Sequence, residues 1–260
     1  MRSASSFDSV ARLYDRARPP YPDDLIQDLF TVARLRPGDR VLEIGCGTGQ
    51  ITVPMARQGL HVTAVELGVN LAEIAGERLA SFPHAEIVVG RFEDYELPRE
   101  PFDLVVSATA FHWLDPAVRM TKAAEALSVG GHLAIIHTRW GVGREVDAFS
   151  KESQACYLRW DDEAPEYFRT PTLSDLSSSW PELDDFPGLG AVQYRQYEQA
   201  RTYSRDEYLD LLRTFSNVNA LGEHARSGLL ECVGDLIDSR FGGTVVRNDL
   251  REMWTAERSE

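Results

Sequence analysis

The chain has 260 residues, of which 43% are apolar, and its formal net charge at pH 7 is −14. Proteins that bind nucleic acid usually present a basic face, and no cluster of Lys and Arg of that kind occurs here, so the charge disfavours nucleic acid as a partner. The longest apolar runs span only a few residues, so the sequence predicts no membrane-spanning helix and no membrane partner. The length suits one large α/β domain, or one domain with a cap.

The three cysteines, Cys46, Cys156 and Cys232, are odd in number and widely spaced. This usage predicts a reducing compartment, without a disulfide framework or a metal cage. The first residues lack a basic segment followed by an apolar stretch, so no secretory signal is expected. We therefore expect a cytoplasmic protein in which Cys46 is a small buried filler. No His, Cys, Asp or Glu cluster has metal-ligand spacing, so no metal site is expected.

The first half of the chain alternates short apolar runs with amphipathic segments. The expected strands are residues 40–44, 61–65, 87–89, 102–108 and 133–136, and the expected helices are 25–33, 51–58, 71–79 and 116–127. Asp115 and Pro116 are expected to begin the last of these helices, with proline at its first position. Apolar strands between amphipathic helices indicate a parallel sheet covered on both faces.

The second half is less regular. Residues 144–190 are rich in Trp, Tyr, Asp, Pro and Ser and are expected to form a helical or irregular cap. Further expected elements are a strand over 192–203, helices over 205–215 and 220–241, and a last strand within 244–257. Because no linker is visible, we expect a single domain over 1–260. Its expected parts are an N-terminal lid segment (1–35), a cofactor-binding core (36–143), the cap (144–190) and the C-terminal strands and helices that complete the sheet (191–260).

A glycine loop follows the first expected strand. Gly45, Gly47 and Gly49 stand at alternate positions, where only glycine lets the backbone approach a ligand closely. The second strand ends at Glu66, 17 residues after Gly49, where a carboxylate is placed to bind both hydroxyls of a ribose. The sequence therefore predicts an adenosine-containing cofactor. A nicotinamide-dependent oxidoreductase is one alternative, although its loop usually reads Gly-x-Gly-x-x-Gly.

Residues 41–49, Val-Leu-Glu-Ile-Gly-Cys-Gly-Thr-Gly, resemble the first motif of the class I S-adenosylmethionine-dependent methyltransferases. The likeness continues through Glu66, residues 90–93 and the strand at 102–106. Phe111-His112-Trp113 resembles a small-molecule methyltransferase subgroup, methyltransferase type 11, that includes trans-aconitate methyltransferase-like proteins. The resemblance implies a Rossmann-like α/β fold, with a seven-stranded, mostly parallel sheet, helices on both faces, and an antiparallel last strand from residue 244 onward.

The same resemblance implies a set of residues that bind S-adenosylmethionine. They are Glu43, Gly45, Cys46, Gly47, Gly49, Glu66, Leu67, Phe92, Glu93 and Ala108. Leu67 would cover one face of the adenine, and Phe92 and Glu93 lie where the family commonly holds that ring. Arg91 departs from the family's pattern, and the alternative is that Glu93 or Asp94 caps the N-terminus of a helix.

Candidate catalytic and substrate-binding residues follow the fourth and fifth strands or precede the first. His112 is a candidate general base, or a packed residue that shapes the pocket. Tyr14 is a second catalytic candidate, and Arg18 could pair with a carboxylate, unless both belong to a surface lead-in helix. Trp113, His137 and Trp140 are expected to line the substrate pocket, with packing as the alternative role.

Methyltransferases that act on amines or nucleic-acid bases often carry Asn/Asp-Pro-Pro-Tyr after strand four, and the segment Ser107–Ala110 lacks this motif. The similar run Arg18-Pro19-Pro20-Tyr21 precedes strand one, so it does not stand at the position where the motif acts. We therefore expect methyl transfer to a small molecule, with an oxygen acceptor, hydroxyl or carboxylate, before nitrogen or carbon. The alternative from another class is a protein that binds S-adenosylmethionine without transferring its methyl group. A monomer or a homodimer is expected.

Overall fold

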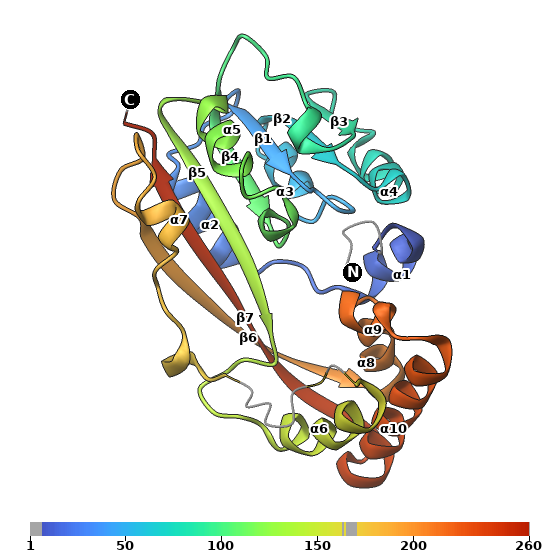
Figure 1. The fold of residues 1–260 in the computed structure, drawn as a ribbon. Coiled ribbons are helices and arrows are strands. Elements are labelled where there is room, and N and C mark those ends of the chain that lie inside the picture. The colour runs from blue at the N-terminus through green and yellow to red at the C-terminus, as the bar shows by residue number, and fades with distance from the viewer. Residues whose placement is uncertain (1–6, 163, 165–170, 260) are drawn as a thin grey trace. The chain divides into compact units, whose positions relative to one another are not determined.

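The computed structural model describes residues 7–162, 164 and 171–259 (Figure 1). The strands are β1 Arg40–Ile44, β2 His61–Glu66, β3 Ala85–Val89, β4 Phe102–Ala108, β5 Leu127–Trp140, β6 Gln193–Ser204 and β7 Thr244–Glu257. The α-helices are α1 Ala11–Ala17, α2 Asp23–Val32, α3 Thr52–Arg57, α4 Val69–Leu79, α5 Arg119–Ala126, α6 Ala148–Trp160, α7 Pro181–Asp184, α8 Arg205–Leu212, α9 Ser216–Ala220 and α10 Glu223–Phe241. Short 3-10 helices are η2 Asp8–Val10, η3 Phe92–Asp94, η4 Phe111–Trp113 and η5 Leu173–Asp175.

The strands form one seven-stranded sheet in the order β3-β2-β1-β4-β5-β7-β6. The neighbours β1, β2, β3, β4 and β5 pair in parallel, and β7 is the antiparallel strand. The α/β fold class, the mostly parallel sheet and the antiparallel last strand are therefore confirmed. Helical connections between parallel neighbours explain why the apolar strands read as continuous runs, because both faces of the sheet are covered.

Two apolar clusters cover the two faces of this sheet. On one face, Leu25 and Leu29 of α2 and Met55 of α3 pack against Val41 and Leu104. On the other face, Met120 and Ala123 of α5 and Leu183 of α7 pack against Leu42 and Trp254. Alternate residues of β1 therefore belong to different clusters, as the period of a pleated strand requires.

The chain divides into two compact units. Unit 1 comprises residues 1–19, 139–176 and 198–250, and unit 2 comprises 20–138, 177–197 and 251–260. The subdivision into lid, core, cap and C-terminal segments stays a prediction, and residues 1–6 of that lid and 163 and 165–170 of that cap lie outside the described part of the chain.

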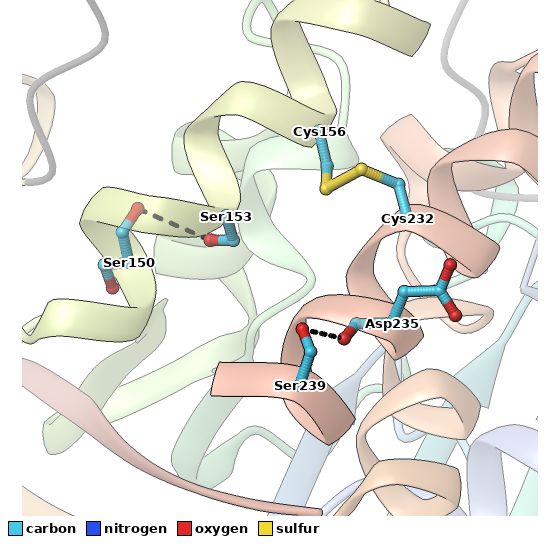
Figure 2. The surroundings of a disulfide bond; sticks show 6 residues. All are labelled: Ser150, Ser153, Cys156, Cys232, Asp235 and Ser239. Carbon is cyan, nitrogen blue, oxygen red and sulfur yellow. Dashed lines mark hydrogen bonds between the residues drawn. A yellow bond between two sulfur atoms is a disulfide. The ribbon is translucent and has the colours of Figure 1, made fainter. Parts of the chain in front are cut away.

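Unit 1 is held by its own apolar cluster and by a disulfide. Helix α10 packs against α6 and α8, and the cluster includes Phe149, Leu212 and Val233. Cys156 of α6 and Cys232 of α10 are joined by a disulfide, with their Cα atoms 5.7 Å apart (Figure 2). The expectation of three unpaired cysteines is therefore wrong. The partners stand 76 positions apart in the sequence, and no local pattern predicts that two helices bring them together.

Several element boundaries differ from those expected, among them the starts of α5 and β5. Helix α5 begins at Arg119, three residues later than predicted, because the Asp115 carboxylate accepts a hydrogen bond from the Ala117 backbone N–H in a turn before it. Strand β5 starts at Leu127 directly after α5 and is 14 residues long, so it includes the glycine pair that was expected to separate helix from strand. Among the helices of the described residues, none has both the length and the apolar character needed to cross a bilayer.

Candidate functional site

The glycine loop after β1 is built on left-handed backbone. Gly45, Gly47 and Gly49 have φ angles of 73°, 58° and 87°, a region that side chains with a Cβ rarely adopt. The Gly45 backbone N–H also donates to the Val65 carbonyl at 2.8 Å, so the loop is tied to β2. A Cβ on Gly45 would lie 2.4 Å from the Cβ of Ala110, so the loop and the end of β4 approach each other only because residue 45 is glycine.

Glu66 ends β2 and is almost buried, with 7% of its surface exposed. Its two carboxylate oxygens accept hydrogen bonds from the backbone N–H groups of Gly47 and Gly68, each at 2.8 Å. The carboxylate therefore joins the glycine loop to the turn after β2. Each carboxylate oxygen can accept more than one hydrogen bond, so this arrangement is compatible with a ligand hydroxyl at the same group.

Glu43 lies in β1, two residues before Gly45, and is fully buried. The Thr52 hydroxyl donates a 2.6 Å hydrogen bond to its carboxylate. Burial raises the pKa of Glu43 to about 7, the hydrogen bond from Thr52 opposes that rise, and the negative charge of Glu66 adds to it. Burial and the same two carboxylates raise the pKa of the Cys46 thiol, so this cysteine is a protonated filler and not a reactive thiolate.

An apolar surface lies beside Glu66. Val89 of β3 pairs with Glu66, and Leu67 follows it in the chain. Both side chains are large and exposed, at 54% and 44% of their surface. Exposed apolar groups beside a buried carboxylate match what an aromatic ring with an attached sugar needs.

Phe92 and Glu93 both make contacts with other residues of unit 2. The Phe92 ring is buried in the apolar cluster, with the Lys122 ammonium 5.3 Å from its centre. A Glu93 carboxylate oxygen accepts from the Asp115 backbone N–H at 2.9 Å. This contact resembles the capping role considered as the alternative for Glu93, although the turn that it caps lies 22 residues away.

The end of β4 carries a strained residue. Thr109 has a φ of 58°, a conformation that costs a residue with a Cβ about 1–2 kcal/mol. Its hydroxyl lies 3.0 Å from those of Tyr21 and Thr138, which connects the start of α2 with β5. Ala108 precedes it and packs on the apolar cluster of α2. Strain of this kind is frequent at functional sites, and none of these three hydroxyls was singled out from the sequence.

Beyond Thr109, two imidazoles lie close together. The rings of His112 in η4 and His137 in β5 are 5.6 Å apart, and the ring of Trp113 is 4.9 Å from that of His112. The surrounding protein lowers the pKa of His112 to about 4 by desolvation, helped by the positive charges of His137 and Arg119. His112, which stands at the surface of unit 2, is therefore neutral near pH 7.

A buried carboxylate completes this group. Glu252 of β7 is fully buried, and its Oε2 atom is 3.8 Å from Nδ1 of His137. The Tyr194 hydroxyl donates to Glu252 Oε1 at 2.6 Å, and the Gln196 amide donates to that hydroxyl at 2.6 Å. Sequence reasoning missed Glu252. No local signal marked it, because Asp249 and Arg251 of the same strand are charged and buried as well.

The remaining candidates belong to unit 1. The Arg18 guanidinium carbon lies 5.0, 4.7 and 4.9 Å from the ring centres of Tyr14, Trp140 and Phe215. Its Nε and Nη2 atoms donate to the Thr214 hydroxyl and carbonyl at 2.8 and 2.9 Å. The structure thus brings Tyr14, Arg18 and Trp140 together around a packed cation, which favours the structural alternative for Arg18.

The model of the methyltransferase domain family matches residues 42–135 of this chain. An uncharacterized methyltransferase of Mycobacterium tuberculosis is 34% identical over 131 residues, which are 50% of this chain and 51% of that protein. The chain therefore spans about half the length of this relative. An uncharacterized methyltransferase of Geobacillus thermodenitrificans is 31% identical over 180 residues, covering 63% of this chain and 80% of that protein.

Solved structures show the same fold. An S-adenosylmethionine-dependent methyltransferase from Geobacter sulfurreducens, crystallised with S-adenosyl-L-homocysteine, superimposes with a TM-score of 0.54 at 15% identity. The match covers 99% of this chain and 100% of that one. At this identity the likeness concerns the arrangement of helices and strands.

Proposed function

The chain belongs to the methyltransferase family, and on that premise we propose that it transfers a methyl group from S-adenosylmethionine to a small molecule. We take oxygen as the acceptor atom. The cofactor supplies a methyl group on a positively charged sulfur, which leaves with the electron pair of its bond to carbon. The task of the protein is therefore to hold the reacting groups in line and to exclude water.

The observation that carries the proposal is the charge around the glycine loop. Glu43 and Glu66 are two buried carboxylates on either side of it, and each raises the pKa of a neighbouring group. A pyrophosphate, as in a nicotinamide dinucleotide, would bring further negative charge to this place. A ligand with a sulfonium and an ammonium group would bring positive charge. The electrostatics therefore support S-adenosylmethionine over the nicotinamide alternative.

The residues of unit 2 fit that cofactor at three points. Glu66 would bind the ribose hydroxyls, since its carboxylate already lies at the end of β2 between two backbone N–H groups. Leu67 and Val89 would cover the adenine with side chains that are exposed. The left-handed glycines would let the loop backbone approach the methionine portion.

The enzyme proposal is tested by supplying S-adenosylmethionine labelled in its methyl group, together with a small-molecule extract, and searching for labelled products by mass spectrometry. We expect at least one labelled small molecule with the wild-type protein and none with a Gly47→Val variant. Binding of S-adenosylhomocysteine without any labelled product would instead indicate a protein that binds the cofactor without transfer.

The other expectations stay predictions. A monomer or a homodimer is expected, with a small molecule as the partner. The Cys156–Cys232 disulfide counts against the predicted cytoplasmic location, because disulfides persist mainly in oxidising compartments.

A further inference from the structure

We propose that His137 and Glu252 form an acid–base pair that takes the proton of a hydroxyl acceptor, while His112 binds that hydroxyl as a neutral imidazole. The proposal rests on the methyltransferase function above and deepens it. It assigns the acceptor to the alcohols and phenols, which must lose a proton, and not to the carboxylates, which need not.

Glu252 is fully buried in β7. A buried carboxylate is unfavourable unless hydrogen bonds or an opposite charge compensate it. Oε1 accepts the hydrogen bond from the Tyr194 hydroxyl, and Oε2 faces Nδ1 of His137 at 3.8 Å. A neutral His137 compensates the carboxylate best with its proton on Nδ1, which leaves Nε2 as the ring nitrogen that can receive a proton. The imidazolium that results compensates the carboxylate better still.

The neighbouring strands hold this geometry. Tyr194 lies on β6, Glu252 on β7 and His137 on β5, three strands that are adjacent in the sheet (Figure 1). Gln196, also on β6, donates to the Tyr194 hydroxyl, which in turn donates its own proton to Glu252. A pair built on sheet strands is held more rigidly than one built on loops.

The second imidazole decides which histidine takes the proton. His112 lies 5.6 Å from His137, and two cations at that distance repel each other. Arg119 adds positive charge on the side of His112, whereas Glu252 adds negative charge on the side of His137. The proton therefore goes to His137. His112 stays neutral, so its one N–H group can donate to the oxygen of the acceptor hydroxyl, and it stands at the surface, where a substrate can reach it.

In the resulting step, the hydroxyl oxygen forms a bond to the methyl carbon as that carbon leaves the sulfonium, whose sulfur keeps the electron pair. The oxygen–hydrogen bond breaks, and its proton moves to Nε2 of His137. The product is a neutral methyl ether, and the imidazolium later returns the proton to water. A carboxylate acceptor releases no proton, so its methylation would not need the His137–Glu252 pair.

The ligand-free protein provides one test. Nitrogen-15 NMR of the imidazole rings at neutral pH distinguishes the Nδ1-protonated from the Nε2-protonated tautomer. We expect neutral His137 to carry its proton on Nδ1 in the wild type, and the Nε2 tautomer to gain population in Glu252→Gln. His61→Asn, which removes an exposed histidine at the start of β2, should leave the His137 signals unchanged. An Nε2-protonated His137 in the wild type would overturn the proposal.

Product chemistry provides the second test. Labelled products from the extract are treated with mild alkali, which hydrolyses methyl esters and leaves methyl ethers intact. We expect alkali-stable product, a loss of initial rate of about 100-fold in His137→Asn, and unchanged binding of S-adenosylhomocysteine. Alkali-labile product, or full activity in His137→Asn, would contradict the acid–base role.

Two further results separate a failure of the acid–base pair from a failure of the proposed methyl transfer. Tyr194→Phe keeps the ring but removes the hydrogen bond to Glu252, and we expect a loss of rate of about 5-fold even if Glu252→Gln fails to fold. If no labelled product forms at all, the proposed transfer fails. The NMR measurement then still decides whether Glu252 orients His137.

Discussion

Unit 1 and unit 2 are stabilised in different ways. In unit 2, apolar layers on both faces of a sheet bury strands that follow one another closely along the chain. Unit 1 gathers three separate stretches of chain around one apolar cluster and adds a disulfide between α6 and α10. Unit 1 therefore relies on a covalent link where unit 2 relies on its sheet.

The two units also treat buried charge differently. In unit 1, Arg247 lies over the rings of Phe149 and Tyr208, and its Nη1 atom donates to Asp147 at 2.8 Å. In unit 2, the carboxylates of Glu43 and Glu66 accept from a hydroxyl and from backbone N–H groups. Unit 1 therefore pairs its buried cation with a carboxylate, whereas unit 2 holds two carboxyl groups by hydrogen bonds at the loop where we propose that a cationic cofactor binds.

The largest expected effect concerns the disulfide. Replacing Cys156 and Cys232 by serine should lower the stability of unit 1 by about 4 kcal/mol, because the closed loop spans 76 residues. Chemical denaturation followed by hydrogen exchange should report this loss in α6 and α10 and not in β1. Cys46→Ala in unit 2 is the control for loss of a thiol. Equal losses of stability in both units would contradict the claim that the disulfide stabilises unit 1 alone.

The second prediction uses the pH dependence of unit 2. Because the pKa of Glu43 is raised to about 7, the folded protein holds a proton that the unfolded chain releases above its ordinary value. The contribution of Glu43 to stability should therefore fall as the pH rises through that window and be lost above pH 7, by about 3 kcal/mol in total.

Denaturation of the wild type and of Glu43→Gln at a series of pH values measures this contribution as the difference between the two curves. Glutamine keeps the shape of the side chain and still accepts the hydrogen bond from Thr52. A difference that stays constant from pH 4.5 to 7.5 would show that Glu43 is ionised throughout.

The third prediction concerns the close approach of the glycine loop and β4. Gly45→Ala should cost about 2–3 kcal/mol, from the left-handed backbone and from the clash with Ala110. Gly38→Ala, where φ is 95° and no atom lies near the added Cβ, should cost only about 1 kcal/mol in the same denaturation assay. Combining Gly45→Ala with Ala110→Gly should recover part of the difference, and no recovery would place the clash elsewhere.

The sequence predicted more of the fold of unit 2 than of unit 1, and the reason is physical. Local patterns predict the strands from Arg40 to Ala108 and the helices between them: apolar runs, glycine turns and helical spacing. The predicted strand bounds agree with the structure to within a few residues. The loop glycines and Glu66 could be singled out from the sequence because a glycine loop and a strand end are local features, and their roles in cofactor binding stay predictions.

The rest depends on contacts between distant residues. The Cys156–Cys232 bond, the Arg18–Thr214 hydrogen bonds and the Glu252–His137 pair each join parts of the chain that no local pattern connects. Glu252 in particular stands in a strand whose register against β5 decides whether it meets a histidine. That register is set by the whole sheet.

Binding of the demethylated cofactor tests the central claim most directly. Calorimetry with S-adenosylhomocysteine should show binding to the wild-type protein, weakened in Glu66→Ala by about 1–3 kcal/mol because charge-assisted hydrogen bonds to the ribose are lost. Glu73→Ala, which removes an exposed carboxylate of α4, should leave the affinity unchanged. NAD should bind neither protein. Equal affinity of S-adenosylhomocysteine for the wild type and Glu66→Ala, or tight binding of NAD instead, would contradict the proposed cofactor site.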